Sequence, residues 1–185
     1  EFAIKNVSIS TKENNLKDIV SLLRVYQNSP ELFILNKMIK NGTLVTDINF
    51  NFNDKGKINK DYSIKGSVIG ANFRLLNKQV IKNINLSFDV KNNQYLIKDT
   101  KFEFNQTKLL SREIKITNLN KYFLIKGDLK NLETLFNPES LSFYFKNNFE
   151  NLGLSNLNFS SDSNFSFKLN KRLKFSDINI KSKIN

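Results

Sequence analysis

Strict alternation of apolar and polar residues, from Gly42 to about Gly127, is the feature that most constrains this chain. A period of two places successive side chains on opposite faces of a strand, so the pattern predicts strands with one apolar and one polar face. Short polar turns separate the alternating runs. The predicted strands cover residues 43–53, 60–71, 80–91, 94–99, 101–106, 109–117 and 121–127.

Short turns between the strands indicate antiparallel neighbours, because a parallel pair needs a crossover of a dozen or more residues. No helical pattern of that length separates the strands. The predicted fold class is therefore mainly β. We expect an elongated, twisted antiparallel sheet of repeating meander strands, curled into an open hydrophobic groove, with a short helix pair near the N-terminus. Gly66 and Gly70 are interpreted as marks of a bulge or bend that helps the sheet to curl.

Two helices are predicted ahead of these strands. Residues 16–27 carry apolar side chains at helical spacing on one face. A second helix follows, with Ser29 as its N-cap, Pro30 at its first position and Asn41-Gly42 as its end. The pair is interpreted as a cap or spacer that packs on the end of the sheet.

The later part of the chain loosely repeats the earlier part. The segment LKDIVSLL at 16–23 is matched by LKNLETLF at 129–136, and DYSIKGSVI at 61–69 is matched by DINIKSKIN at 177–185. A brief helix is predicted over 129–137, ending at Pro138. The repeat predicts a modular, growing sheet rather than a closed globule. We expect one segment of a larger repeat protein over residues 1–185, composed of the end of a preceding strand (1–10), a helical insert (11–42), a first antiparallel strand module (43–128) and the start of a second, similar module (129–185).

The residue types that are absent exclude many kinds of catalytic and metal-binding site. The chain has no Cys, no His and no Trp, which removes disulfides, thiol nucleophiles, thiolate zinc sites and imidazole acid–base catalysis. Asp89 and Glu113 are candidate catalytic carboxylates, but isolated carboxylates on a polar strand face are usually solvated. The turn at Asp54 offers a single carboxylate, which is too few for calcium. We therefore expect no enzyme activity, no cofactor and no metal.

The formal net charge is +12, from 29 Lys and Arg against 17 Asp and Glu. Asn makes up about one residue in six, and Lys, Asn, Ile and Phe are all encoded by A- and T-rich codons. Nucleotide bias therefore explains much of the lysine excess. No nucleic-acid partner is expected, because the Phe side chains alternate onto the face opposite the Lys side chains and cannot form a mixed platform with them. A basic face would still favour anionic lipid headgroups.

The functional question is what covers the apolar face, since such a face left in water promotes aggregation. The sheet could fold into a two-layer sandwich, close on itself, or form an open trough whose dry interior holds lipid chains. Phe, Ile and Leu dominate the face, with few polar groups to fix a small ligand, which favours the trough. The alternative is a structural or adhesive β-repeat protein with a self-packed core and no lipid ligand. The candidate groove residues that would contact phospholipid acyl chains are Ile48, Phe50, Phe52, Tyr62, Ile64, Val68, Ile84, Leu86, Phe88, Phe102, Phe104, Ile114, Ile116, Phe123 and Ile125.

Four strand motifs also follow one another in a fixed order. They are a G-x-L opening at Gly42-Thr43-Leu44, a K-G strand at Lys65-Gly66, a strand from Val80 to Phe88, and a closing I-K-G segment from Ile125 to Leu129. In this order they resemble the AsmA-like proteins, in particular the long YhdP-type members. The resemblance implies a parent anchored in the inner membrane of a Gram-negative bacterium, through a part of the chain not present here, with this segment in the periplasm. It further implies a bridge along which phospholipid slides passively towards the outer membrane, without catalytic residues.

Overall fold

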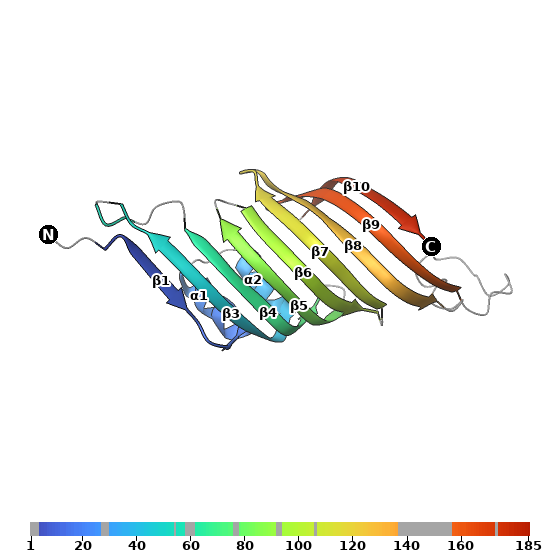
Figure 1. Cartoon of the computed structure of the whole chain (residues 1–185), viewed down its shortest axis with the longest axis horizontal. Coiled ribbons are helices and arrows are strands. Elements are labelled where there is room, and N and C mark those ends of the chain that lie inside the picture. The colour runs from blue at the N-terminus through green and yellow to red at the C-terminus, as the bar shows by residue number, and fades with distance from the viewer. Residues whose placement is uncertain are drawn as a thin grey trace.

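The computed structural model (Figure 1) describes residues 4–26, 30–53, 55–57, 62–75, 78–91, 94–105, 107–136, 157–172 and 174–185. No helix in these ranges is long and apolar enough to cross a membrane. The helices and strands, in chain order, are β1 (Asn6–Ser10), β2 (Asn14–Asn15), α1 (Leu16–Tyr26), α2 (Pro30–Met38), β3 (Ile39–Asn51), β4 (Ser63–Arg74), β5 (Val80–Lys91), β6 (Gln94–Phe104), β7 (Thr107–Asn118), β8 (Tyr122–Phe136), β9 (Leu157–Asn170) and β10 (Phe175–Ile184).

All ten described strands belong to one antiparallel sheet. Their order along the sheet is β1-β3-β4-β5-β6-β7-β8-β9-β10, and the short strand β2 pairs with β3. From β3 onwards, each strand therefore pairs with its neighbours in the chain. Figure 1 shows one twisted layer, with α1 and α2 behind the sheet near β3, β4 and β5. The predicted class is confirmed: a mainly β chain with an open antiparallel meander sheet and two short helices near the N-terminus.

Bulges interrupt the pairing of most neighbouring strands. The register shifts in β3–β4, β4–β5, β5–β6, β7–β8, β8–β9 and β9–β10. Gly70, Asn83 and Asp99 lie within these shifts and have φ angles of +60°, +53° and +51°. A bulge adds a residue, bends the strand and displaces the alternation by one position. Val68 and Ala71 are therefore next to each other on one face of the sheet, although they are three residues apart in the sequence. The bend predicted at Gly70 is confirmed.

Strand β6 runs without a break from Gln94 to Phe104. The predicted division into strands 94–99 and 101–106 is therefore wrong. The left-handed conformation of Asp99 displaces the alternation inside the strand, and in the sequence this displacement looks like the end of one strand and the start of another.

The helix pair covers one corner of the sheet. Leu16 and Val20 of α1 are buried against Ile39, Ala71 and Ile84 of the sheet, as expected for a cap. These five are the buried apolar side chains of the described residues. The partly buried apolar side chains packed around them are Leu32, Leu35, Leu44, Val68, Phe73, Ile81, Leu86 and Phe102. We call this cluster the helix-covered corner.

Helix α2 ends earlier than predicted. Its last residue is Met38 and β3 starts at Ile39, so the predicted helix end at Asn41-Gly42 is wrong. Gly42 instead lies within β3 with φ +137°, where a Cβ would come 2.6 Å from the Cβ of Ala71. This close approach of two strands requires glycine. The predicted N-cap, Ser29, lies outside the described residues.

The helix predicted over 129–137 is also wrong as far as residue 136, because β8 continues to Phe136. Leu129 and Leu132 have the spacing of residues on one helix face. In β8 the residues three apart that lie together are instead Asn131 and Thr134, which flank the register shift and whose side chains are hydrogen-bonded at 2.8 Å. The pairing of β8 with β7 and β9 overrides the local preference for a helix.

The two segments matched as a sequence repeat differ in structure. Residues 16–23 lie in α1, whereas residues 129–136 lie in β8. The boundary expected between residues 128 and 129 falls inside β8, and the sheet continues across it. Pro138 lies outside the described residues.

Candidate functional site

The face of the sheet that carries α1, here called the inner face, holds a continuous row of apolar side chains. Val68 of β4 packs in the helix-covered corner, and Ile64 lies on the same face because no bulge separates it from Val68. Successive cross-strand partners then run from β1 to β9. This first ladder consists of Ile9, Ile48, Ile64, Val90, Tyr95, Ile116, Ile125 and Phe167. Its length is about 34 Å, taking a spacing of about 4.8 Å between strands.

A second ladder runs beside the first, two residues away from it on each shared strand. It consists of Thr46, Gly66, Phe88, Ile97, Ile114, Gly127, Phe165 and Ile180. Gly66 pairs in regular register with Thr46 and Phe88, so its prediction as a bulge is wrong. Its missing side chain makes room for the ring of Phe88. On β9 the rings of Phe165 and Phe167, one from each ladder, are stacked with their centroids 5.9 Å apart.

The predicted groove residues divide into two groups. Ile84 is buried in the helix-covered corner, and Val68, Leu86 and Phe102 are packed against this corner. The remaining candidates are half-buried by their neighbours in the sheet. Those that the structure brings into the two ladders are Ile48, Ile64, Phe88, Ile114, Ile116 and Ile125. Those that lie beside the ladders are Phe50, Phe52, Tyr62, Phe104 and Phe123.

Several ladder residues were not among the predicted candidates. Tyr95 and Ile97 flank Leu96, which faces the other side, so the run Tyr95-Leu96-Ile97 hides the alternation. Val90 and Phe167 continue alternating runs and could have been included by extending each run to its end. Burial, and then the nearby Tyr62, raise the pKa of the Tyr95 phenol, which therefore stays neutral.

The opposite, outer face is mainly polar. Lys65 and Asp89, which are cross-strand partners, form an ion pair of 3.7 Å. Ser8 donates a hydrogen bond of 2.6 Å to the side-chain oxygen of Asn49. These exposed contacts contribute little stability, and they leave the outer face well suited to water.

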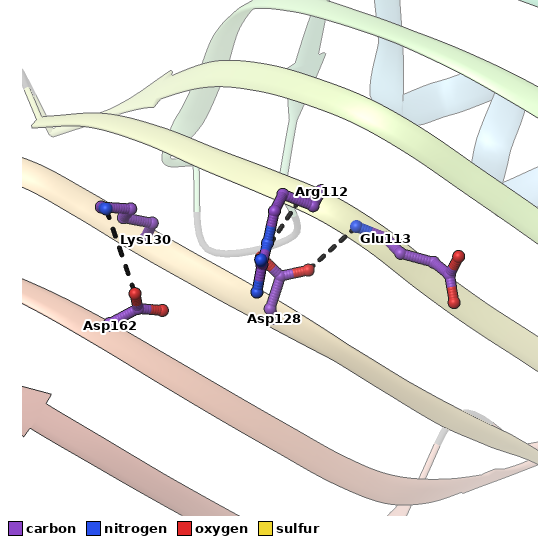
Figure 2. Close-up of polar contacts among 5 residues, drawn as sticks. All are labelled: Arg112, Glu113, Asp128, Lys130 and Asp162. Carbon is purple, nitrogen blue, oxygen red and sulfur yellow. Dashed lines mark hydrogen bonds and ion pairs between the residues drawn. The ribbon is translucent and has the colours of Figure 1, made fainter.

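A polar cluster lies around Asp128 at the bulge between β7 and β8 (Figure 2). Its carboxylate accepts hydrogen bonds from the backbone N–H groups of Arg112 at 3.1 Å and Glu113 at 2.9 Å, and from Arg112 Nε at 3.3 Å. Burial alone would raise the pKa of Asp128, but these hydrogen bonds outweigh it and lower the pKa. Lys130 and Asp162 form a 4.0 Å ion pair beside it. The carboxylate therefore accepts hydrogen bonds from backbone N–H groups at the bulge, and the role of the cluster is structural.

The described part of the chain contains no group of three or more Asp and Glu residues that could hold a metal ion. Comparisons with models of protein families, with curated proteins and with solved structures gave no match. The inner face is therefore the candidate site on its geometry alone.

Proposed function

We propose that the inner face binds the acyl chains of phospholipids and forms one groove segment of a bridge-like protein that transports phospholipid between membranes. The observation that carries this proposal is the pair of ladders, which together extend across the sheet from β1 to β10 on one face. The described strands form a single sheet, so no second sheet covers the ladders within the described residues. The half-buried side chains keep apolar surface that a bound chain would remove from water, at about 25 cal/mol per Å².

The chemistry of the ladders favours a sliding chain over a fixed small ligand. Specific small-molecule sites combine apolar walls with a few convergent polar groups. Thr46 is the polar side chain of the second ladder, and its hydroxyl is already 3.0 Å from that of Thr11. Tyr95 supplies the one hydroxyl of the first ladder. Acyl chains need no polar partner, and their headgroups would remain in water beyond the strands.

The remainder of the proposal follows from the resemblance to AsmA-like proteins. The segment would lie in the periplasm, as part of a protein anchored in the inner membrane. It would act without catalysis or cofactor. The alternative, an adhesive or structural β-repeat, expects two sheets packed face to face about 10 Å apart, and the single described sheet favours the lipid groove over it.

Photo-crosslinking tests the proposal directly. A photoreactive amino acid at Phe50, Ile64 or Phe88 on the inner face is expected to capture phospholipid, which mass spectrometry of the purified protein would detect. The matched controls occupy adjacent outer-face positions, Asn49, Lys65 and Ser87, and are expected to capture none. Labelling of protein alone at all three inner positions would refute the lipid groove.

A further inference from the structure

The helix pair presents a second apolar surface, turned away from the sheet. On α1, Leu22 and Val25 are 56% and 81% exposed, whereas Leu16 and Val20 are buried against the sheet. Val25 lies about 180° around the helix from Leu16, at about 100° per residue. A helix that serves only as a cap needs one apolar face. Helix α1 has two, and the second is unexplained by packing within the described residues.

Phe33 of α2 adds to this surface. The ring is 41% exposed, and two cations approach it, with Arg24 Cζ 5.0 Å and Lys37 Nζ 4.4 Å from the ring centroid. The Ser21 hydroxyl donates a hydrogen bond of 3.2 Å to the side-chain oxygen of Asn36, which holds the two helices together. We define the helix patch as Leu22, Arg24, Val25, Phe33 and Lys37.

We propose that the helix patch docks onto the surface of a phospholipid bilayer that contains anionic lipid. Large apolar side chains beside Lys and Arg characterise helices that lie in the membrane interface. The apolar groups enter the headgroup region while the cations reach phosphate. Asp18 is the one acidic residue of α1, and the chain as a whole carries +12, so the long-range field favours an anionic surface. This docking is independent of whether lipid occupies the inner face.

Fluorescence can test the docking because the chain contains no Trp. Val25→Trp places a single reporter in the helix patch, and Ile69→Trp places one at an exposed apolar position of β4. With vesicles of phosphatidylcholine and phosphatidylglycerol, the emission of Val25→Trp is expected to shift to the blue, and that of Ile69→Trp to stay unchanged. Added salt should reverse the shift, because it screens surface charges. An unshifted Val25→Trp spectrum, or equal shifts at both positions, would overturn the proposal.

Charge reversal provides a second test of the docking to the bilayer. Arg24→Glu with Lys37→Glu should lower vesicle affinity about 25-fold or more, since each cation near an anionic surface is worth about fivefold. Lys115→Glu with Lys126→Glu makes the same change in net charge at exposed cross-strand partners of β7 and β8. This control should retain most of the binding, and a loss as large as in the helix patch would show that overall charge is responsible. Circular dichroism of both variants checks that the sheet is intact. Photo-crosslinking at Phe88 separately measures whether phospholipid binds to the inner face.

Discussion

Phe88 on β5 lies over Gly66 on β4, so closely that a Cβ at residue 66 would come 2.8 Å from the ring Cζ and would also collide with the carbonyl oxygen of Val45. Phe165 lies over Gly127 in the same way, with its Cζ 2.9 Å from the position of a Cβ. Both glycines belong to the second ladder and end an Ile-Lys-Gly segment. The two segments are therefore structural equivalents, each placing an aromatic ring over a strand glycine, a known means of stabilising such positions.

Gly66→Ala is expected to destabilise the fold by about 1–3 kcal/mol, because overpacking forces shifts in well-packed neighbours. The collision with the Val45 carbonyl involves backbone, so adding Phe88→Leu should restore only part of the loss. Urea unfolding monitored by circular dichroism gives the free energies. Gly56→Ala is the control: this turn glycine has φ +70° and open space around it, so it reports conformational strain alone. Equal losses at Gly56 and Gly66 would show that close packing is not the reason for Gly66.

Asp128→Ala is expected to lower the free energy of unfolding by about 2–4 kcal/mol, because it leaves two bulge N–H groups without their acceptor. Asp128→Asn keeps an acceptor oxygen and should lose less. Removal of the partner guanidinium by Arg112→Ala should cost least, since its side chain is largely exposed and its backbone N–H remains bonded. Urea unfolding of the three variants would test this order, and an Arg112→Ala loss equal to that of Asp128→Ala would contradict it.

The same carboxylate predicts a pH dependence. Its pKa in the folded chain is below the ordinary value of 3.8, so the ionised form is bound more tightly by the fold than by the unfolded chain. The resulting stabilisation is fully present above pH 3.8 and is lost as the pH falls through the lower, folded value. Acid unfolding of the unaltered chain should therefore contain a component that Asp128→Asn lacks. Superimposable pH profiles of the two proteins would exclude this role.

The alternation in the sequence was sufficient to predict most of the strands from β3 to β8 and the different composition of their two faces. Ile48 and Ile64, chosen from separate runs, are cross-strand partners in the first ladder. Alternation could not reveal the bulges, because a displaced residue such as Asp99 resembles a turn. Nor could it separate a helix from a bulged strand over residues 129–136: Leu129 and Leu132 have helical spacing, but the segment belongs to β8, with a register shift between Asn131 and Thr134.

The sequence also could not show how much of the inner face the helices leave open. Ile84 and Ile116 both belong to alternating runs, yet only Ile84 is buried in the helix-covered corner. Which part of a face a helix covers depends on chain connections and helix placement, and the spacing of apolar residues carries no information on either. Tertiary contacts therefore decided which of the predicted groove residues remain available to a ligand.

Truncation of Ile39 and of Ile116 should separate covered from open parts of the inner face. Ile39 is 1% exposed in the helix-covered corner, and Ile39→Ala should cost about 2–5 kcal/mol, as for a fully packed core residue. Ile116 is half-buried in the first ladder, and Ile116→Ala should cost about 1 kcal/mol, since part of its surface is already in water. The comparison requires only urea unfolding. If Ile116→Ala were as costly as Ile39→Ala, the ladder would be a packed core, and the lipid groove would lose its physical basis.

A single carboxylate on the first ladder should block lipid retention. Ile116→Asp places a charge among the apolar side chains, where an acyl chain could not solvate it, so its burial would be strongly unfavourable. Thr117→Asp makes the same change in charge one residue later on the outer face. Phospholipid extracted from each purified variant, relative to protein, is expected to fall severalfold for Ile116→Asp and to stay unchanged for Thr117→Asp. Circular dichroism establishes that both sheets are folded before lipid is compared. Because the two positions are adjacent on β7, a difference between them can come only from the face that each side chain occupies, and equal retention would argue against acyl chains on the ladder.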